Sequence, residues 1–349
     1  MTIVPLIHQY LDQFYLKYGD QLLPSQQAAI NAMLRCRTPA SGELHVHCHQ
    51  CQRSEWRPLS CGNRNCPQCQ NHATTQWLDR QQKKLLPVDY FLVTFTLPRQ
   101  LRSLAWHHQK TVYQLFFDCV SQTLREFALN PKNLDADIGM TAVLHTHSRR
   151  LDYHPHIHVV APGGGVHRKR RHWKKIKGQY LFNEFNLATV FRAKFLQRLF
   201  AEGFYIPDDT PKTWVTDCQH AGKGLSALKY LSCYLYRGVI SENNIIANQN
   251  GNITFKYTDS ASGVSKTRSL KAADFLWLVL QHVLPKGFRR VRDYGFLHGN
   301  AKKLLGLVQI ILQVKIIPGQ LRPRPIFKCQ KCQSPMTILG FIWPRFNPG

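Results

Sequence analysis

The chain has 349 residues, and its 46 Lys and Arg outnumber its 20 Asp and Glu, which leaves a formal charge of +26 at pH 7. This length allows one large domain or two smaller ones, and the charge predicts a polyanionic partner: nucleic acid first, a membrane surface as the weaker alternative. No apolar stretch is long enough to span a membrane, and the first residues lack the basic-then-apolar pattern expected of a signal peptide. The 11 cysteines are therefore expected to bind metals in a reducing compartment rather than to form disulfides.

The first 35 residues are predicted to be helical. Apolar side chains recur at spacings of three and four residues from Ile7 to Tyr18, the period of an amphipathic helix. Pro24 interrupts this pattern, and Ser25 is placed to cap a second helix that continues to Leu34. We expect both helices to be packing elements.

A dense group of cysteines follows. Cys48 and Cys51 form one C-x-x-C knuckle, Cys66 and Cys69 form a second, and 14 residues separate the two. This spacing is typical of a zinc ribbon, in which two knuckles supply the four thiolates of one structural zinc site. A redox-active dithiol is the alternative.

Further cysteines and arginines lie in the same region. Cys36 and Cys61 could form a second zinc site with nearby histidines, although cysteine is also a common core residue. Arg64 lies between the knuckle cysteines, and basic modules of this kind usually bind nucleic acid; a purely structural lid is the alternative. Residues 1–85 are thus predicted to be a helical and zinc-binding module that contacts DNA through Arg64.

From residue 89 the sequence has the character of a packed core. Residues 90–97 are rich in β-formers and end at Pro98. Residues 100–128 and 187–202 carry apolar side chains at helical spacing, which predicts two amphipathic helices.

Two histidine-bearing strands follow the first of these helices. Side chains alternate between the two faces of a strand, so His156 and His158 point one way while Ile157 points into a core. His145 and His147 repeat the alternation. If residues 140–147 and 156–161 pair as an antiparallel hairpin, three or four imidazoles converge on one sheet surface. This predicts a divalent-metal site; scattered polar positions on a half-exposed sheet are the alternative.

A strongly basic segment comes after three glycines. Residues 167–177 contain seven Lys and Arg among eleven residues, with Trp173 between them. This composition suits a flexible phosphate-binding arm, and a merely solvated loop is the alternative. The predicted DNA contacts are Arg168, Lys169, Arg170 and Arg171.

Residues 222–238 are predicted to form a helix that ends at Gly238. Leucines at 228, 231 and 235 then form one apolar stripe. Tyr230 and Tyr234 share a different face, beside Lys223 and Arg237. Tyrosines that avoid the apolar stripe and lie near cations are predicted nucleophiles, and the two cations are predicted DNA contacts. Ordinary surface tyrosines are the alternative.

The remaining sequence gives weaker signals. Asn250-Gly251 between two β-rich runs predicts a hairpin, residues 265–270 a strand, and residues 274–284 a short helix. Residues 301–349 are expected to be a poorly defined C-terminal tail, in which Cys329 and Cys332 form half a zinc knuckle without an assigned partner.

These motifs together resemble the HUH endonucleases, and most closely the rolling-circle tyrosine transposases with an N-terminal zinc-binding domain, the family of insertion sequence ninety-one. The resemblance is carried by residues 36–38, 60–70, 93–98, 144–147, 154–158, 229–234 and 282–288. It implies that His156 and His158 take the HUH positions and that His145 is a third metal ligand. Cys233 stands where the family usually has arginine, so one phosphate contact is missing.

The resemblance also implies a fold and an activity. The fold is α+β, an antiparallel sheet backed by helices of the HUH endonuclease type over residues 86–300, preceded by the small zinc-ribbon-like module. Mg²⁺ or Mn²⁺ at the histidines and Zn²⁺ in the N-terminal module are the implied cofactors. The implied enzyme is a transposase that cleaves and rejoins single-stranded DNA through a 5′-phosphotyrosine intermediate in the bacterial cytoplasm, associated with the nucleoid. A rolling-circle replication initiator and a catalytically decayed, zinc-stapled DNA-binding protein are the alternatives, and the sequence leaves the oligomeric state open.

Overall fold

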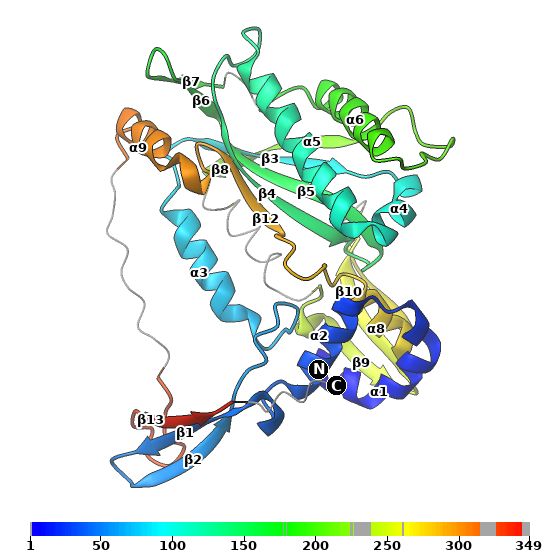
Figure 1. The fold of residues 1–349 in the computed structure, drawn as a ribbon, viewed down its shortest axis with the longest axis vertical. Helices are drawn as coiled ribbons and strands as arrows, with labels where there is room; N and C mark the ends of the chain where they lie inside the picture. The colour runs from blue at the N-terminus through cyan, green and yellow to red at the C-terminus, as the bar shows by residue number, and fades with distance from the viewer. Residues whose placement is uncertain are drawn as a thin grey trace.

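A computed structural model describes residues 2–176, 178, 180–223, 226, 239–259, 262–314 and 326–343, with the side chains of residues 70–75 left undescribed. A central sheet forms the upper part of the molecule in Figure 1, and helices cover both of its faces. A helical body with its own small sheet and a separate three-stranded sheet lie below it (Figure 1). None of the helices in the described ranges is both long enough and apolar enough to cross a membrane.

The central sheet has five strands in the order β12-β4-β5-β3-β8, and every neighbouring pair is antiparallel. Its strands are β3 (Asp89–Thr96), β4 (Gly139–His147), β5 (Tyr153–Pro162), β8 (Thr216–Lys223) and β12 (Val291–Gly295). Strands β4 and β5 form the predicted hairpin, with His145 opposite His156. The expected α+β architecture, an antiparallel sheet backed by helices, is therefore confirmed.

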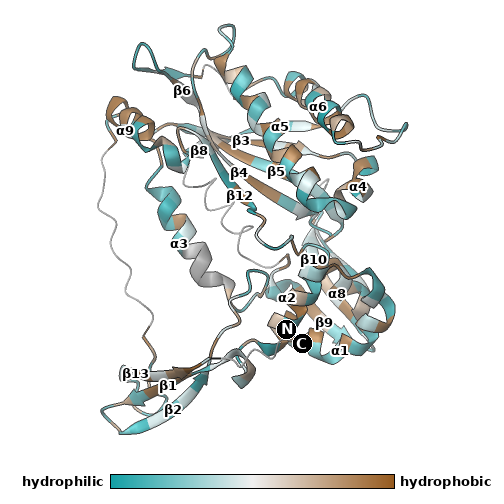
Figure 2. Cartoon of the chain, in the orientation of Figure 1, coloured by the Kyte–Doolittle hydropathy of each residue, from teal (hydrophilic) through white to brown (hydrophobic). Residues whose placement is uncertain are grey.

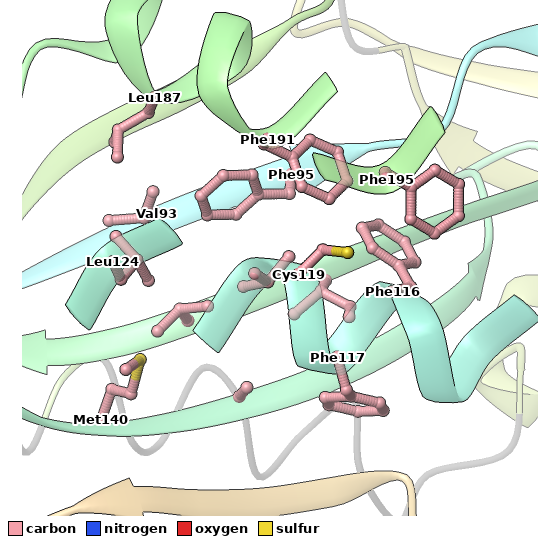
Figure 3. Close-up of a cluster of buried hydrophobic side chains, with 14 of the residues drawn as sticks. Val93, Phe95, Phe116, Phe117, Cys119, Leu124, Met140, Leu187, Phe191 and Phe195 are labelled. Atoms are coloured by element: carbon pink, nitrogen blue, oxygen red, sulfur yellow. The ribbon is translucent and has the colours of Figure 1, made fainter. Parts of the chain in front are cut away.

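Three helices belong to this part of the molecule: α4 (Arg102–His107), α5 (Gln109–Leu129) and α6 (Glu184–Ala201). One continuous helix over 100–128 was expected, but the chain breaks at His108, whose φ of −120° and ψ of 41° are not helical. Helices α5 and α6 cover one face with an aromatic core that includes Phe95, Phe191 and Phe195 (Figure 3). Ile157 and Val159 join this core. His156 and His158 alternate with them along β5 and therefore point to the opposite face.

Helix α3 (Gln70–Gln82) lies on that opposite face. Trp77 packs there against Tyr90, Val143 and Val160, one side chain from each of three neighbouring strands. Figure 2 shows β4 as largely hydrophobic, and of the described side chains of α3, Trp77 and Leu78 join the contact. The histidine face is thus only partly covered by described residues.

The basic segment after the glycines is a β-hairpin rather than a flexible arm. Strands β6 (Gly164–His167) and β7 (His172–Lys175) pair in register. The hairpin is held to the segment that leads into β4 by Arg168, which contacts Asp137 at 2.8 Å, and by Lys174, which contacts Asp135 at 2.6 Å. Cross-strand pairing and these ion pairs give the segment the structure that its charge content alone did not predict.

The N-terminal helices belong to a body that a later part of the chain completes. Helices α1 (Ile3–Tyr18) and α2 (Pro24–Arg35) share a core with β9 (Ile245–Gln249), β10 (Asn252–Thr258), β11 (Ser265–Lys271) and α8 (Ala272–Leu280). Helix α2 begins at Pro24, one residue before the expected cap. Residues 239–283, which were expected to belong to the domain over 86–300, therefore pack with the N-terminal helices.

The expected hairpin at Asn250-Gly251 is present, because both residues adopt positive φ values, 49° and 72°. This left-handed backbone at two consecutive positions is the geometry of a tight two-residue hairpin turn. The hairpin places Ile253 and Phe255 of β10 in the shared core.

A small three-stranded sheet has the order β13-β1-β2. It contains β1 (Glu43–Cys48), β2 (Arg53–Pro58) and β13 (Thr337–Ile342), and β13 pairs antiparallel with β1. The prediction of a poorly defined tail is wrong for two segments. Residues 302–314 include helix α9 (Lys302–Ile311), and in residues 326–343 strand β13 pairs with β1.

Candidate metal centres and nucleic-acid interface

Three histidines converge on the open face of the central sheet. His145 on β4 lies opposite His156 on β5, and His158 lies two residues further along β5, on the same face. One ligand nitrogen from each lies within 4.8 Å of the others. The ring centroids of His145 and His158 are 4.7 Å apart, and those of His156 and His158 are 4.8 Å apart. Three imidazoles this close form a facial set of metal donors.

Hydrogen bonds fix which nitrogen of the two β5 histidines faces the centre. Nδ1 of His156 donates to the carbonyl oxygen of His154 at 2.7 Å, so Nε2 carries the lone pair. Nδ1 of His158 lies 2.9 Å from the hydroxyl of Thr94, which sits opposite it on β3. Such outer contacts orient metal-binding imidazoles and hold their tautomer.

All three imidazoles are held in the neutral form. Burial lowers the pKa of His158 to about 3, with a further contribution from His156. Burial also lowers the pKa of His156, and it lowers that of His145 well below the usual value. A neutral imidazole has the free lone pair that a divalent cation needs, so the donor set fits a metal ion.

The neighbouring histidines have other roles. His147 continues the same strand, but its ring centroid lies 6.1 Å from that of His145, and it is not part of the converging set. Nε2 of His282 lies 3.0 Å from the carbonyl of Leu151, and its Nδ1 lies 3.1 Å from the hydroxyl of Thr146. His282 therefore ties the end of α8 to the β4–β5 hairpin.

The cysteines form two groups of four, and neither is the predicted one. Cys66 and Cys69 lie with Cys36 and Cys61, beside the N-terminal helices. A second group joins Cys48 and Cys51 on the small sheet with two cysteines from the end of the chain, Cys329 and Cys332. The expected site of Cys48, Cys51, Cys66 and Cys69 is wrong. Strand β13 pairs with β1, and this brings the knuckle of Cys329 and Cys332 to the knuckle of Cys48 and Cys51.

Both groups have the dimensions of a tetrathiolate zinc site. A tetrahedron with Zn–S bonds of about 2.3 Å places its sulfurs about 3.8 Å apart. The measured Sγ–Sγ distances are 3.5 Å for Cys36–Cys69 and 3.6 Å for Cys61–Cys69. Those of the second group are 3.4 Å for Cys48–Cys332 and 3.8 Å for Cys51–Cys332.

The environment lowers the pKa of some thiols in these groups and raises that of others: burial, for example, raises the pKa of Cys36 to about 11. Hydrogen bonding, first from Cys66, lowers the pKa of Cys61 to about 5. The backbone of Ser334 is the first cause that lowers the pKa of Cys332 to about 6. With four protein ligands each, both sites are structural in type, since no coordination position is left for a substrate.

The residues predicted to contact DNA differ in their exposure and in the partners they already have. The Arg64 guanidinium donates to the carbonyl oxygens of Phe288 at 2.5 Å and Pro285 at 3.1 Å, so this arginine anchors a chain segment and is not a purely exposed contact. Lys169, Arg170 and Arg171 are exposed at the hairpin tip, and Lys223 is exposed at the end of β8. Tyr230, Tyr234 and Arg237 lie outside the described residues.

Sequence reasoning missed the C-terminal ligands and the full set around Cys66. The signal for the first was present, because Cys329 and Cys332 have knuckle spacing. The signal for the second was the pair Cys36 and Cys61, which was expected to bind zinc with nearby histidines because Cys66 and Cys69 were assigned to the other site. Only the fold shows which knuckles meet.

Two family models match the chain. One, described as "Transposase zinc-binding domain", matches residues 6–97, and the other, described as "Putative transposase", matches residues 139–304. The zinc-binding model covers six of the eight cysteines in the two groups, and the other model contains the three converging histidines.

Known proteins are similar over most of the chain. "Putative transposase y4qJ" of Sinorhizobium fredii is 32% identical over 341 residues, which cover 89% of this chain and 84% of the relative. The transposase for insertion sequence element IS801 of Pseudomonas savastanoi pv. phaseolicola is 28% identical over 288 residues, which cover 77% of this chain and 69% of the relative. No solved structure matches the chain.

Proposed function

The chain belongs to the insertion sequence ninety-one family of transposases with an N-terminal zinc-binding domain, and on this premise we propose that it cleaves and rejoins single-stranded DNA by metal-assisted tyrosine transesterification. The observation that carries the proposal is the convergence of His145, His156 and His158, as neutral imidazoles, on the open face of an antiparallel sheet. The sheet is proposed to be of the HUH endonuclease type.

The three histidines would hold Mg²⁺ or Mn²⁺, which supplies a Lewis acid for a phosphodiester oxygen and neutralises the charge that develops during cleavage. The protein contributes orientation. Thr94 and the carbonyl of His154 fix the rings of His158 and His156, so little reorganisation is needed when the phosphate binds.

Tyr230 and Tyr234 are the proposed nucleophiles. The phenolic oxygen attacks phosphorus and loses its proton, the bond to the 3′-oxygen breaks, and that oxygen takes up a proton to become a free 3′-OH. The DNA is then joined to the enzyme as a 5′-phosphotyrosine. Because the phosphodiester energy is retained, a 3′-OH on another strand can reverse the step, and two tyrosines allow two cleaved ends to be held together.

Basic groups and zinc support this chemistry. The formal charge of +26 fits a DNA partner, and we propose that the single-stranded ends of the mobile element are the substrate. The zinc groups would stabilise the N-terminal module and the small sheet without taking part in cleavage. We further propose that the protein acts in the bacterial cytoplasm, on the nucleoid.

The test is trapping of a covalent adduct. The protein is incubated with radiolabelled single-stranded DNA and Mn²⁺, denatured, and examined for label that remains on the protein. The double variant Tyr230→Phe/Tyr234→Phe should form none. Tyr236, two residues further along, would lie on another face of the expected helix, so Tyr236→Phe should form a normal amount. An adduct in the double variant would disprove the assignment, and a wild-type protein that binds DNA without any adduct would indicate a decayed enzyme.

A further inference from the structure

Besides the exposed cations at the tip of the β6–β7 hairpin, a cluster of cationic side chains lies on the histidine face of the central sheet. A pocket of about 430 Å³ opens between helix α3, the loop of the first cysteine group and the segment that leads into β12. Its cationic lining residues are Arg64, Arg80, Lys84, Arg289 and Arg290. These residues come from three separate parts of the sequence, so no local charge run in the sequence indicates the cluster.

Asp293 is the one acidic residue among the described residues that line the pocket, and its carboxylate already has partners. Asp293 contacts Lys84 at 2.6 Å and accepts a hydrogen bond from the hydroxyl of Thr141 at 2.6 Å. Arg80 and Arg289 are exposed, and neither forms an ion pair with any residue in the described ranges. Guanidinium groups that line one pocket repel each other, and an anionic ligand would offset that repulsion.

The pocket lies close to the histidines. Val291 on the pocket wall pairs with Val143, and Val143 pairs with His158, so the three residues form one row across the sheet. Strands are spaced by about 4.8 Å, which places the wall about 10 Å from His158. The backbone carbonyl of Arg290 also accepts a hydrogen bond from the N–H of Leu144, the residue before His145. One extended strand of DNA can therefore reach both places.

We propose that this pocket binds the phosphodiester backbone of the DNA strand next to the phosphate held at the histidines. The proposal rests on the proposed function, because it assumes that single-stranded DNA is the ligand. Arg80 and Arg289 contact phosphate oxygens directly. Arg64 is a positioning residue: its bonds to the carbonyls of Pro285 and Phe288 connect the loop of the first cysteine group to the segment that carries Arg289.

The first test measures binding without cleavage. Affinity for a fluorescein-labelled oligothymidylate is titrated against salt, with zinc-loaded protein and no added Mg²⁺ or Mn²⁺. Each phosphate contact contributes about 0.7 to the slope of log K against log salt for a single strand. Arg80→Gln/Arg289→Gln should therefore lower the slope by about 1.4. The matched control is Arg125→Gln/Lys132→Gln, which removes two exposed charges on or next to α5, on the other face of the sheet.

The control should leave the slope close to that of the wild type. An unchanged slope in the pocket variant, or an equal fall in both variants, would overturn the proposal. Thermal unfolding followed by circular dichroism checks that both variants are folded, as expected for exposed polar substitutions. Since no cleavage is required, failure of the tyrosine chemistry would leave this result intact.

A second measurement locates the contact along the DNA. Phosphates of an oligonucleotide that forms the covalent adduct are replaced one at a time by uncharged methylphosphonate, and binding is measured again. Wild-type protein should lose affinity at one or two positions beside the cleaved phosphate, and the pocket variant should lose this sensitivity while keeping that at the cleaved phosphate. The same interference pattern in both proteins would contradict the placement.

Discussion

The pairing of the N-terminal and C-terminal knuckles makes a sharp prediction about zinc content. Two groups of four cysteines imply two zinc ions per chain. Cys329→Ser/Cys332→Ser removes half of the ligands of one group and leaves the other group, around Cys66, unchanged. Because a structural zinc site contributes about 10–16 kcal/mol of binding free energy, loss of two thiolates should empty the site rather than weaken it slightly. The variant should therefore retain one zinc per chain.

Elemental analysis by mass spectrometry on purified, desalted protein measures this directly. Cys218→Ser is the control, since Cys218 lies outside both groups and should leave two zinc ions. Proteolysis gives a second measurement: emptying the site removes the ligands that hold β13 against β1, so residues 326–343 should become sensitive to protease. Two zinc ions in the Cys329→Ser/Cys332→Ser variant would refute the pairing of Cys48 and Cys51 with the C-terminal cysteines.

Three other perturbations test separate parts of the structure. Thr94→Val removes the hydroxyl that holds Nδ1 of His158 and should weaken Mn²⁺ binding by about 10–100-fold in calorimetry; an unchanged affinity would show that the contact does not orient the ring. Lys169→Gln/Arg170→Gln/Arg171→Gln should lower the salt slope of single-stranded DNA binding by about 2, whereas Arg168→Gln, whose side chain already pairs with Asp137, should have a smaller effect per charge; equal effects per charge would contradict this division. Phe191→Ala leaves a cavity among Phe95, Phe116 and Phe195. The free energy of unfolding, measured by urea titration, should fall by about 3–5 kcal/mol. A fall below about 1 kcal/mol would mean that the core is not packed as described.

Sequence reasoning succeeded where the pattern was local. Alternation along a strand was enough to predict that His156 and His158 share a face, and the short connection between the expected strands 140–147 and 156–161 favoured the pairing with His145. The left-handed turn at Asn250-Gly251 was predictable for the same reason, since two adjacent residues determine it.

It failed where distant segments meet. Cys48 and Cys332 are separated by 284 positions in the chain, and nothing within either knuckle specifies its partner. The sequence predicted a hairpin at Asn250-Gly251 and a short helix over 274–284, but it could not show that these elements pack with the N-terminal helices. The cationic pocket escaped notice for the same physical reason, because Arg80 and Arg289 become neighbours only after α3 packs on the sheet.

The central claim is that the three histidines hold the ion at which a DNA strand is cut, and metal-dependent adduct formation tests it most directly. His158→Gln and wild-type protein are compared for single-stranded DNA binding and for covalent adduct over a Mn²⁺ titration. The wild type should form adduct only with the metal, and the variant should bind DNA with similar affinity but form none. An adduct in the wild type that persists without divalent metal, or one of normal yield in His158→Gln, would contradict the account.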